Sequence, residues 1–280
     1  MRSITPRETF TMTPLRRIAC AIALALPLGS TALAAQPASA GTASATAADQ
    51  AFTRLADQYF DSYYFPTNPS AATADGFHAW DGKLEDYSRA GVDANVKALK
   101  QWEARVSAVD PKTLGEFVRG DRTLVLNNIR STLLTLETIR PWQKNPDNYS
   151  SGIASSAFTL MERQFPPPEA RLRALIAREK QMPAALADAH ANLDNPPAIY
   201  TQIALEQLPG LVEFFQHDVP AAFADAADAG LKQQFAASNG AVIKALQDYQ
   251  AWLKSDLLPR SHGDFRLGAQ AYRDKLKYDE

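Results

Sequence analysis

The feature that most constrains the fold is a pair of apolar runs, each opened by prolines, between Phe165 and Gln216. Pro166–Pro168 precede the first run, and Pro196 and Pro197 precede the second. Proline suits the first turn of a helix, because its missing N–H has no helical partner there and its fixed φ already fits. In the first run, apolar side chains recur at helical steps and share one face: Leu172, Leu175, Met182, Leu186 and Leu193. The stretch therefore predicts two helices.

The second run is apolar on more than one side, through Ile199, Ile203, Leu205, Leu208, Leu211, Val212, Phe214 and Phe215. This pattern predicts a central helix that neighbouring helices cover. Pro183 and Pro209 fall inside the two helical patterns. Proline there removes a hydrogen bond and crowds the preceding turn, so we expect a kink at each.

Residues 1–34 have the pattern of a cleaved export signal. Arg16 and Arg17 precede an apolar run from Ile18 to Leu28, and Ala32 and Ala34 match the A-x-A pattern of a signal-peptidase site. The run is shorter than the roughly 20 residues that a membrane span requires. We therefore expect a periplasmic or secreted protein that uses the general secretory route, with a second possible cut after residue 40.

The mature chain is expected to be mildly acidic and free of disulfides. Cleavage after Ala34 removes four arginines and one glutamate from a net charge of −2, which leaves −2 − (+3) = −5. No basic stripe follows, which argues against a nucleic-acid partner. The only cysteine, Cys20, leaves with the signal, so the core must supply the stability. No later apolar run is long enough to span a bilayer.

The remaining chain reads as a flexible leader, residues 35–48, followed by one helical domain, residues 49–280. The leader is rich in Ala, Ser, Thr and Gly, which cannot form a core. No later stretch alternates at the strand period over more than a few positions, so the fold class is all-α with about nine helices. The first helix is expected to end at Pro66, and Asn68 is expected to cap a helix that starts at Pro69.

The loop Asp75–Gly82 is the segment most typical of a binding site. Asp75, His78 and Asp81 could bind a divalent metal ion if the loop folds back on itself. Alternatively, the aspartates form turns with the glycines while the two aromatic side chains anchor the loop on the core. The second interpretation is the commoner one, so these three residues are weak binding candidates, and no catalytic, cofactor-binding or metal-binding residue is predicted.

Other candidate groups have an equally ordinary structural interpretation. His190 with Asp194, and His262 with Asp264, could be metal pairs, but a histidine satisfied by a neighbouring carboxylate is commoner. Trp142 and Tyr149 could line a carbohydrate site, although packing over a helix end is favoured. No Gly-rich phosphate loop, G-x-S-x-G elbow or H-E-x-x-H helix is present.

A succession of short motifs runs through the chain: Asn68–Thr73, Gly76, His78, Asp81, Leu84, Tyr87-Ser88, Asn145-Pro146-Asp147, Tyr149, Pro167-Pro168, Ala170-Arg171, Pro183, Leu193, Pro196-Pro197, Phe265–Gly268, Tyr272 and Leu276. Together these motifs resemble the bacterial family catalogued as domain of unknown function 885. The resemblance covers nearly the whole mature chain, and it lies in the order and spacing of the motifs.

The resemblance implies an exported, mostly helical protein grouped with zinc metallopeptidases. It also implies a zinc site built from a His-Glu/Gly-His helix and a Glu-Gly-Trp-Ala helix in the second half of the domain. Neither motif occurs here, so this chain resembles the N-terminal half alone, with zinc, a C-terminal catalytic half and a peptide substrate implied as partners of the whole protein. We expect the chain to be inactive alone.

Two hypotheses follow for function. In the first, the chain supplies scaffold and substrate-cleft walls to an exported metallopeptidase-like protein. In the second, it is a stand-alone exported helical binding protein without catalytic activity. The first predicts an uncovered apolar face near the end of the chain, at Phe265, Leu267, Tyr272 and Leu276, because little sequence follows to cover it.

Overall fold

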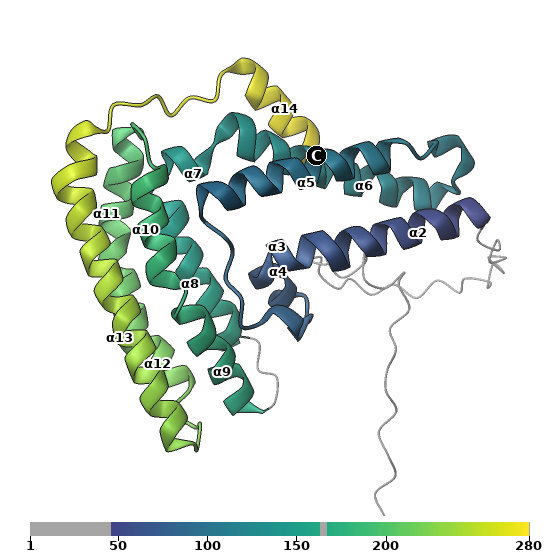
Figure 1. Cartoon of the computed structure of the whole chain (residues 1–280). Helices are drawn as coiled ribbons and strands as arrows, with labels where there is room; N and C mark the ends of the chain where they lie inside the picture. The colour runs from purple at the N-terminus through teal and green to yellow at the C-terminus, as the bar shows by residue number, and fades with distance from the viewer. Residues whose placement is uncertain (1–45, 163–166, 280) are drawn as a thin grey trace, which may run out of the picture.

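The computed structural model describes residues 46–162 and 167–279. Across these ranges the regular structure is helical throughout, without strands, which confirms the all-α prediction (Figure 1). Nine α-helices have 11 residues or more, as expected: α2 (Ala47–Tyr59), α5 (Arg89–Ser107), α6 (Glu116–Leu133), α8 (Asp147–Glu162), α9 (Pro168–Glu179), α10 (Met182–Asn192), α11 (Ala198–Glu213), α13 (Ala229–Trp252) and α14 (Ala269–Asp279). No helix in the described ranges is long and apolar enough to cross a membrane.

Short helical elements join or extend these nine helices. The short α-helices are α3 (Phe65–Thr67), α4 (Pro69–Ala74), α7 (Pro141–Lys144) and α12 (Val219–Ala222). Wider π-helical turns occupy Phe60–Tyr64, Leu134–Ile139, Phe214–Asp218 and Leu253–Leu257, and tighter 3-10 turns occupy His78–Trp80, Pro111–Thr113 and Leu258–Arg260.

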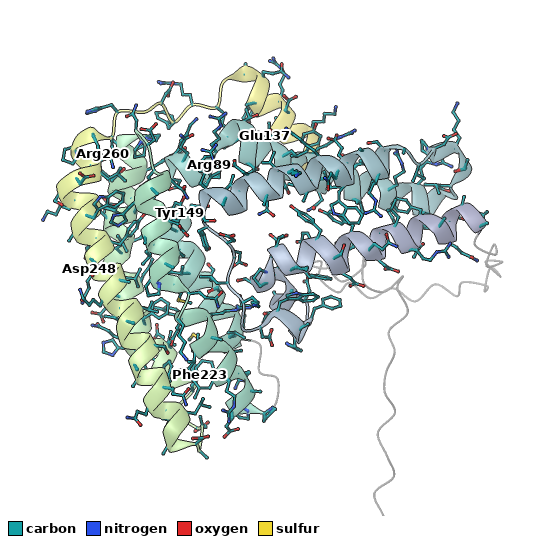
Figure 2. All side chains as sticks on the ribbon, viewed as in Figure 1. Arg89, Glu137, Tyr149, Phe223, Asp248 and Arg260 are labelled. Carbon is teal, nitrogen blue, oxygen red and sulfur yellow. The ribbon has the colours of Figure 1, made fainter. Side chains whose placement is uncertain are left out.

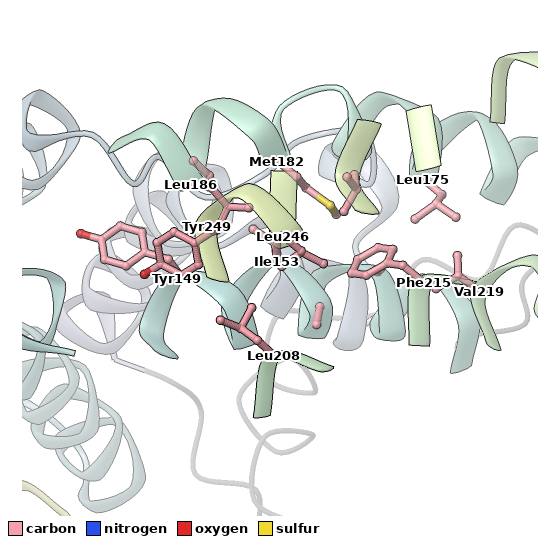
Figure 3. Close-up of a cluster of buried hydrophobic side chains, with 14 of the residues drawn as sticks. Tyr149, Ile153, Leu175, Met182, Leu186, Leu208, Phe215, Val219, Leu246 and Tyr249 are labelled. Atoms are coloured by element: carbon pink, nitrogen blue, oxygen red, sulfur yellow. The ribbon is translucent and has the colours of Figure 1, made fainter. Parts of the chain in front are cut away.

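Two apolar cores organise the described chain. Helices α8–α13 form one bundle around the larger core, and α2, α5 and α6 pack around the smaller one (Figure 1). Several side chains of the larger core lie close together and are fully buried, among them Leu175, Met182, Phe215 and Leu246 (Figure 3). After α13 the chain runs across to α14, which packs on α6 in the other bundle. The larger core also buries the face that periodicity predicted for the first proline-opened run, from Leu172 to Leu193.

The proline-opened stretch folds into three helices where the sequence predicts two. The first run breaks after Glu179, and α10 begins at Met182 with Pro183 in its first turn. Proline tolerates that position, so the chain starts a new helix there in place of the expected kink. Pro209 lies inside α11 as predicted, and the helix changes to π-helical geometry from Phe214.

Helix α11 is covered on one face only, so the prediction of a central, covered helix is wrong. Thr201, Ala204 and Leu208 are buried against the bundle. On the other side, Ile199 is 46% exposed and Ile203 is 38% exposed. The helix therefore has apolar residues on both sides, and its neighbours cover only one of them.

The first helix begins earlier and ends later than predicted. Thr46 and Asp49 form a capping box, in which each side chain accepts from the other residue's N–H. Residues 47 and 48 of the predicted leader are therefore helical, whereas residues 1–45, with the predicted signal, lie outside the described residues. The π-helical turn carries the chain through Pro66 to Thr67.

Asn68 does not cap α4 as predicted, although α4 begins at Pro69 as expected. Its side-chain amide donates to Tyr64 O at 2.8 Å, a carbonyl in the last turn of the preceding helix. The residue therefore satisfies a helix C-terminus and not the N-terminus that follows it.

The segment after α13 is held against the α10–α11 connection at Gly263. The Gly263 N–H donates to Pro196 O at 3.1 Å. A Cβ atom at this position would lie 2.2 Å from Asn195 O, a backbone atom. Only glycine permits so close an approach of the two chain segments.

Gly263→Ala is therefore expected to lower the free energy of unfolding by about 1–3 kcal/mol, because the clashing carbonyl belongs to the backbone. Gly240→Ala is the matched control, since an added Cβ on α13 meets nothing within 4 Å. That substitution should raise stability by about 0.5–1 kcal/mol. Urea unfolding measures both changes, and equal effects at the two positions would contradict the expectation.

Candidate functional site

The predicted loop Asp75–Gly82 is anchored by its aromatic side chains. The Phe77 ring lies 4.3 Å from the Phe65 ring, and the Trp80 ring lies 5.8 Å from the same ring, measured between centroids. Between them, His78–Trp80 form one 3-10 turn. The loop is thus tied to the end of the first helix, as the structural interpretation predicts.

This anchored turn brings His78 onto Asp81. His78 Nδ1 lies 3.0 Å from Asp81 Oδ2, and the His78 side chain is 42% exposed. Asp81 is 7% exposed, and its other oxygen accepts a hydrogen bond of 2.6 Å from Thr73 Oγ1. The pair therefore joins a solvent-facing imidazole to a carboxylate that is held inside the protein.

Arg178 on α9 supports this pair from the core. Its guanidinium is 0% exposed and donates to Thr73 Oγ1 at 2.6 Å, to Ser156 O at 2.7 Å and to Pro69 O at 3.2 Å. Burial lowers the pKa of Arg178, and the nearby carboxylates, that of Asp81 among them, oppose this shift. A buried polar chain, Arg178–Thr73–Asp81–His78, thus runs from α9 to the surface loop; we call it the Arg178 network.

The Arg178 network can fix the orientation and the tautomer of His78. An Nδ1–H that donates to Asp81 leaves Nε2 as the acceptor nitrogen, which suits a general base or a metal ligand. Asp75 lies at the exposed C-terminal end of α4. In the described part of the chain no three His, Cys, Asp or Glu residues gather to hold a metal ion. The structure thus brings His78 and Asp81 together, and the binding role of the three candidates stays a prediction.

The other two acid–histidine pairs do not form among the described contacts. The His190 ring stacks on Trp252, with centroids 3.9 Å apart, and burial lowers its pKa. The His262 N–H donates to a side-chain oxygen of Asn195 at 2.8 Å, whereas the neighbouring Asp264 pairs with Arg266 at 3.2 Å. Sequence spacing alone suggested both pairs; the His190 ring contacts another helix, and Asp264 pairs with its near neighbour Arg266.

Trp142 and Tyr149 are structural, as favoured from the sequence. Trp142 is 7% exposed and Tyr149 is 0% exposed. Trp142 Nε1 donates to Leu136 O at 2.9 Å, and the Tyr149 hydroxyl donates to Trp142 O. Both aromatic side chains therefore close the end of a helix and offer no open platform.

The charges on the outer side of α13 and of the helical turns after it form solvated ion pairs. Asp248, labelled in Figure 2, pairs with Lys244 at 2.7 Å, and Arg260, also labelled, pairs with Asp256 at 3.0 Å. All four side chains are more than 40% exposed, so these pairs contribute little to stability. This surface does not resemble a site.

Sequence reasoning missed Glu179, the buried acid next to Arg178. Glu179 is 0% exposed; Oε2 accepts from the Ser238 hydroxyl on α13, and Oε1 has no hydrogen-bond partner. Burial raises the pKa of its carboxyl to about 8. The signal was present in the spacing, because residue 179 lies four positions after Leu175 and so shares its apolar face.

Comparison with known proteins identifies a family, and it identifies a solved structure of similar fold. The family model described as "Bacterial protein of unknown function (DUF885)" matches residues 69–280. A solved structure described as "a putative lipoprotein of unknown function from Shewanella oneidensis" superposes with a TM-score of 0.73 at 26% sequence identity. The match covers 81% of this chain but 42% of the Shewanella chain, so this chain spans less than half of that protein. No curated protein matches.

Proposed function

Because the chain belongs to the bacterial family of unknown function DUF885, we propose that it is the N-terminal scaffold and substrate-cleft half of an exported zinc-metallopeptidase-like protein. The observation that carries this proposal is the share of the Shewanella chain that the match covers. The match accounts for 42% of the Shewanella chain, which leaves 100 − 42 = 58% of that chain without a counterpart here. The family resemblance assigns the zinc-binding helices to such a second half.

The described residues do not by themselves fit a zinc ion. Structural and catalytic zinc sites use three or four protein ligands. No group of three His, Cys, Asp or Glu residues occurs in the ranges that the structure describes. We therefore assign this chain no step of metal chemistry. Its part in the proposal is to hold helices and loops, among them the loop Asp75–Gly82 (the His78 loop), beside a site that the second half supplies.

A second candidate function is a stand-alone exported helical binding protein. One observation favours it: both cores are well packed, with Phe52, Leu99 and Ile129 in the smaller core at most 2% exposed. A chain with two such cores can fold without further sequence. In that case the His78 loop would be the first surface to test for a ligand.

The deciding experiment supplies the second half. The full chain is mixed with the part of the Shewanella protein that has no counterpart here, and zinc content and hydrolysis of a peptide library are measured. We expect stoichiometric zinc and cleavage only in samples that contain the second half, with cleavage requiring both parts. A second half that cleaves equally well alone would remove the cleft role from this chain.

A further prediction concerns metal in the isolated chain. After dialysis the chain alone should retain no stoichiometric zinc, because no three His, Cys, Asp or Glu residues gather in the described ranges to supply the ligands that zinc requires. Elemental analysis by mass spectrometry measures the content. One tightly bound ion per chain, lost in His78→Ala and kept in the control His217→Ala, would contradict the prediction and favour the metal interpretation of the loop.

A further inference from the structure

The end of the described chain presents large apolar side chains to solvent. Phe265 is 51% exposed and Leu267 is 36% exposed in the segment before α14, while Tyr272 is 57% and Leu276 is 38% exposed on α14 itself. These four were the residues predicted from the sequence to be uncovered. Tyr272 and Leu276 lie four positions apart, so they form one row along the helix. We call these four residues the α14 surface.

Helix α14 buries little on its inward side. Of its described side chains only Ala271 is buried, at 8% exposed. Two other inward residues, Asp274 and Tyr278, line an open pocket of about 290 Å³. Its remaining walls are mostly polar, with Glu103, Arg130, Glu137 and Thr138 beside Leu133 and Leu134. An isolated helix of 11 residues is marginal in water and needs packing of an apolar face for stability. The largest apolar face of α14 is the one that points outward.

Other exposed apolar side chains lie on helices that are already anchored. Phe117 is 87% exposed on α6, but that helix buries Val125, Leu126 and Ile129 in the smaller core. Likewise α11 exposes Ile199 while it buries Leu208. Among the described helices of 11 residues or more, α14 alone buries no large apolar side chain. This distinguishes the α14 surface from scattered exposed residues, which are ordinary.

A row of positive charge flanks the apolar row. Arg273 and Lys277 follow Tyr272 and Leu276 by one position each, and they lie four positions apart on the adjacent strip of the helix. Arg273 donates to Gln270 Oε1 at 2.9 Å, and Lys277 lies over the Tyr278 ring at 5.8 Å. Neither forms an ion pair with a described carboxylate. A partner that matches both rows would carry apolar side chains beside Asp or Glu.

We propose that the α14 surface docks the second half of the family's domain, through a helical face that is apolar and flanked by acidic residues. This inference rests on the proposed function, and it deepens it by naming where the two halves meet. The 58% of the Shewanella chain without a counterpart here provides an occupant of sufficient size. Docking would bury both rows of α14 and add to the small apolar area that this helix buries on its inward side.

The test mixes the full chain with that unmatched part of the Shewanella protein, made as a separate polypeptide. Hydrogen exchange maps the contact, and titration gives Kd. We expect residues 265–276 to become protected, and Tyr272→Ser and Leu276→Ser each to weaken binding about tenfold or more. Arg273→Glu should weaken binding and reduce its salt dependence. Phe117→Ser is the matched control, because it removes a more exposed apolar side chain from α6 and should change Kd by less than about twofold.

Three outcomes would overturn the inference. Protection on α6 or α11, with unchanged binding by Tyr272→Ser, would place the contact elsewhere and leave the proposed function standing. If no complex forms in conditions where the two parts of the Shewanella protein associate, both the docking inference and the proposed function are overturned. A dimer of the chain alone that Leu276→Ser dissociates would make a second copy the occupant.

Discussion

Replacing Arg178 by methionine is expected to lower the free energy of unfolding by about 3–5 kcal/mol. The guanidinium is fully buried and donates to Thr73 Oγ1, Ser156 O and Pro69 O. Methionine fills a similar space but donates no hydrogen bond. It would leave buried acceptors without their donor, and the Asp81 carboxylate behind Thr73 without its nearby positive charge.

Arg171→Met is the matched control for this prediction. Arg171 lies on the same helix and is 9% exposed, but its hydrogen bonds, to Leu160 O and Met161 O, are both 3.5 Å long. Its replacement should cost about 1 kcal/mol or less. Urea unfolding followed by circular dichroism measures both variants. If the two substitutions lower the free energy of unfolding equally, the Arg178 network adds nothing beyond the packing of a long side chain.

A double-mutant cycle measures the coupling free energy between Arg178 and Asp81 separately from the effect of removing each buried side chain. Arg178→Met and Asp81→Asn should not be additive, because Thr73 links the two groups, and a coupling of about 0.5–3 kcal/mol is expected. The imidazole of His78 gives a second readout, since its Nδ1 resonance should change in both single variants. Additive stability changes and an unaltered His78 resonance would show that the two groups act separately.

The fold was largely predictable, because helical periodicity reports local geometry. Leu172, Leu175 and Leu186 recur at steps that only a helix places on one face, and the structure buries all three. The predictions failed where packing against neighbouring helices determines the structure. Pro183 could kink a helix or begin one, and the apolar second side of α11 could be covered or exposed. Tertiary packing chose between these outcomes, and no local pattern records that choice.

The candidate site was predictable only in part. The spacing of His78 and Asp81 placed both in one short loop, and the structure joins them at 3.0 Å. The residue that holds Asp81 in place, Arg178, reaches Thr73 across 105 positions of sequence, so no local motif could have announced it. The same limit explains His190, whose true neighbour is Trp252 on another helix and not the acid four residues away.

The pH dependence of stability should be dominated at alkaline pH by Glu179. Burial raises the pKa of its carboxyl from 4.5 to about 8, and the hydrogen bond from Ser238 opposes that shift only partly. Between these two pH values the folded protein keeps a proton that the unfolded chain has released. Folded protein is therefore favoured by low pH, and stability falls as pH rises.

The size of this effect follows from the shift. The stabilising contribution is fully present below pH 4.5 and is lost as pH rises through about 8. Each pKa unit corresponds to about 1.4 kcal/mol, so the loss is on the order of 3–5 kcal/mol. Urea unfolding between pH 5 and 9, followed by circular dichroism, should show this decline. The buried position between α9 and α13 makes ionisation costly, because Oε1 has no partner to stabilise the charge.

Glu179→Gln isolates the carboxyl, because the amide keeps the shape and cannot ionise. The variant should match the wild type in stability near pH 4.5 and exceed it above pH 8, so the difference between the two curves grows with pH. Glu169→Gln is the control on the same helix: backbone hydrogen bonds lower the pKa of Glu169, so that group affects stability only on the acid side. Its variant should keep the alkaline decline. Parallel curves for wild type and Glu179→Gln from pH 5 to 9 would mean that the folded protein already holds Glu179 ionised, with a partner for Oε1 that comes from solvent.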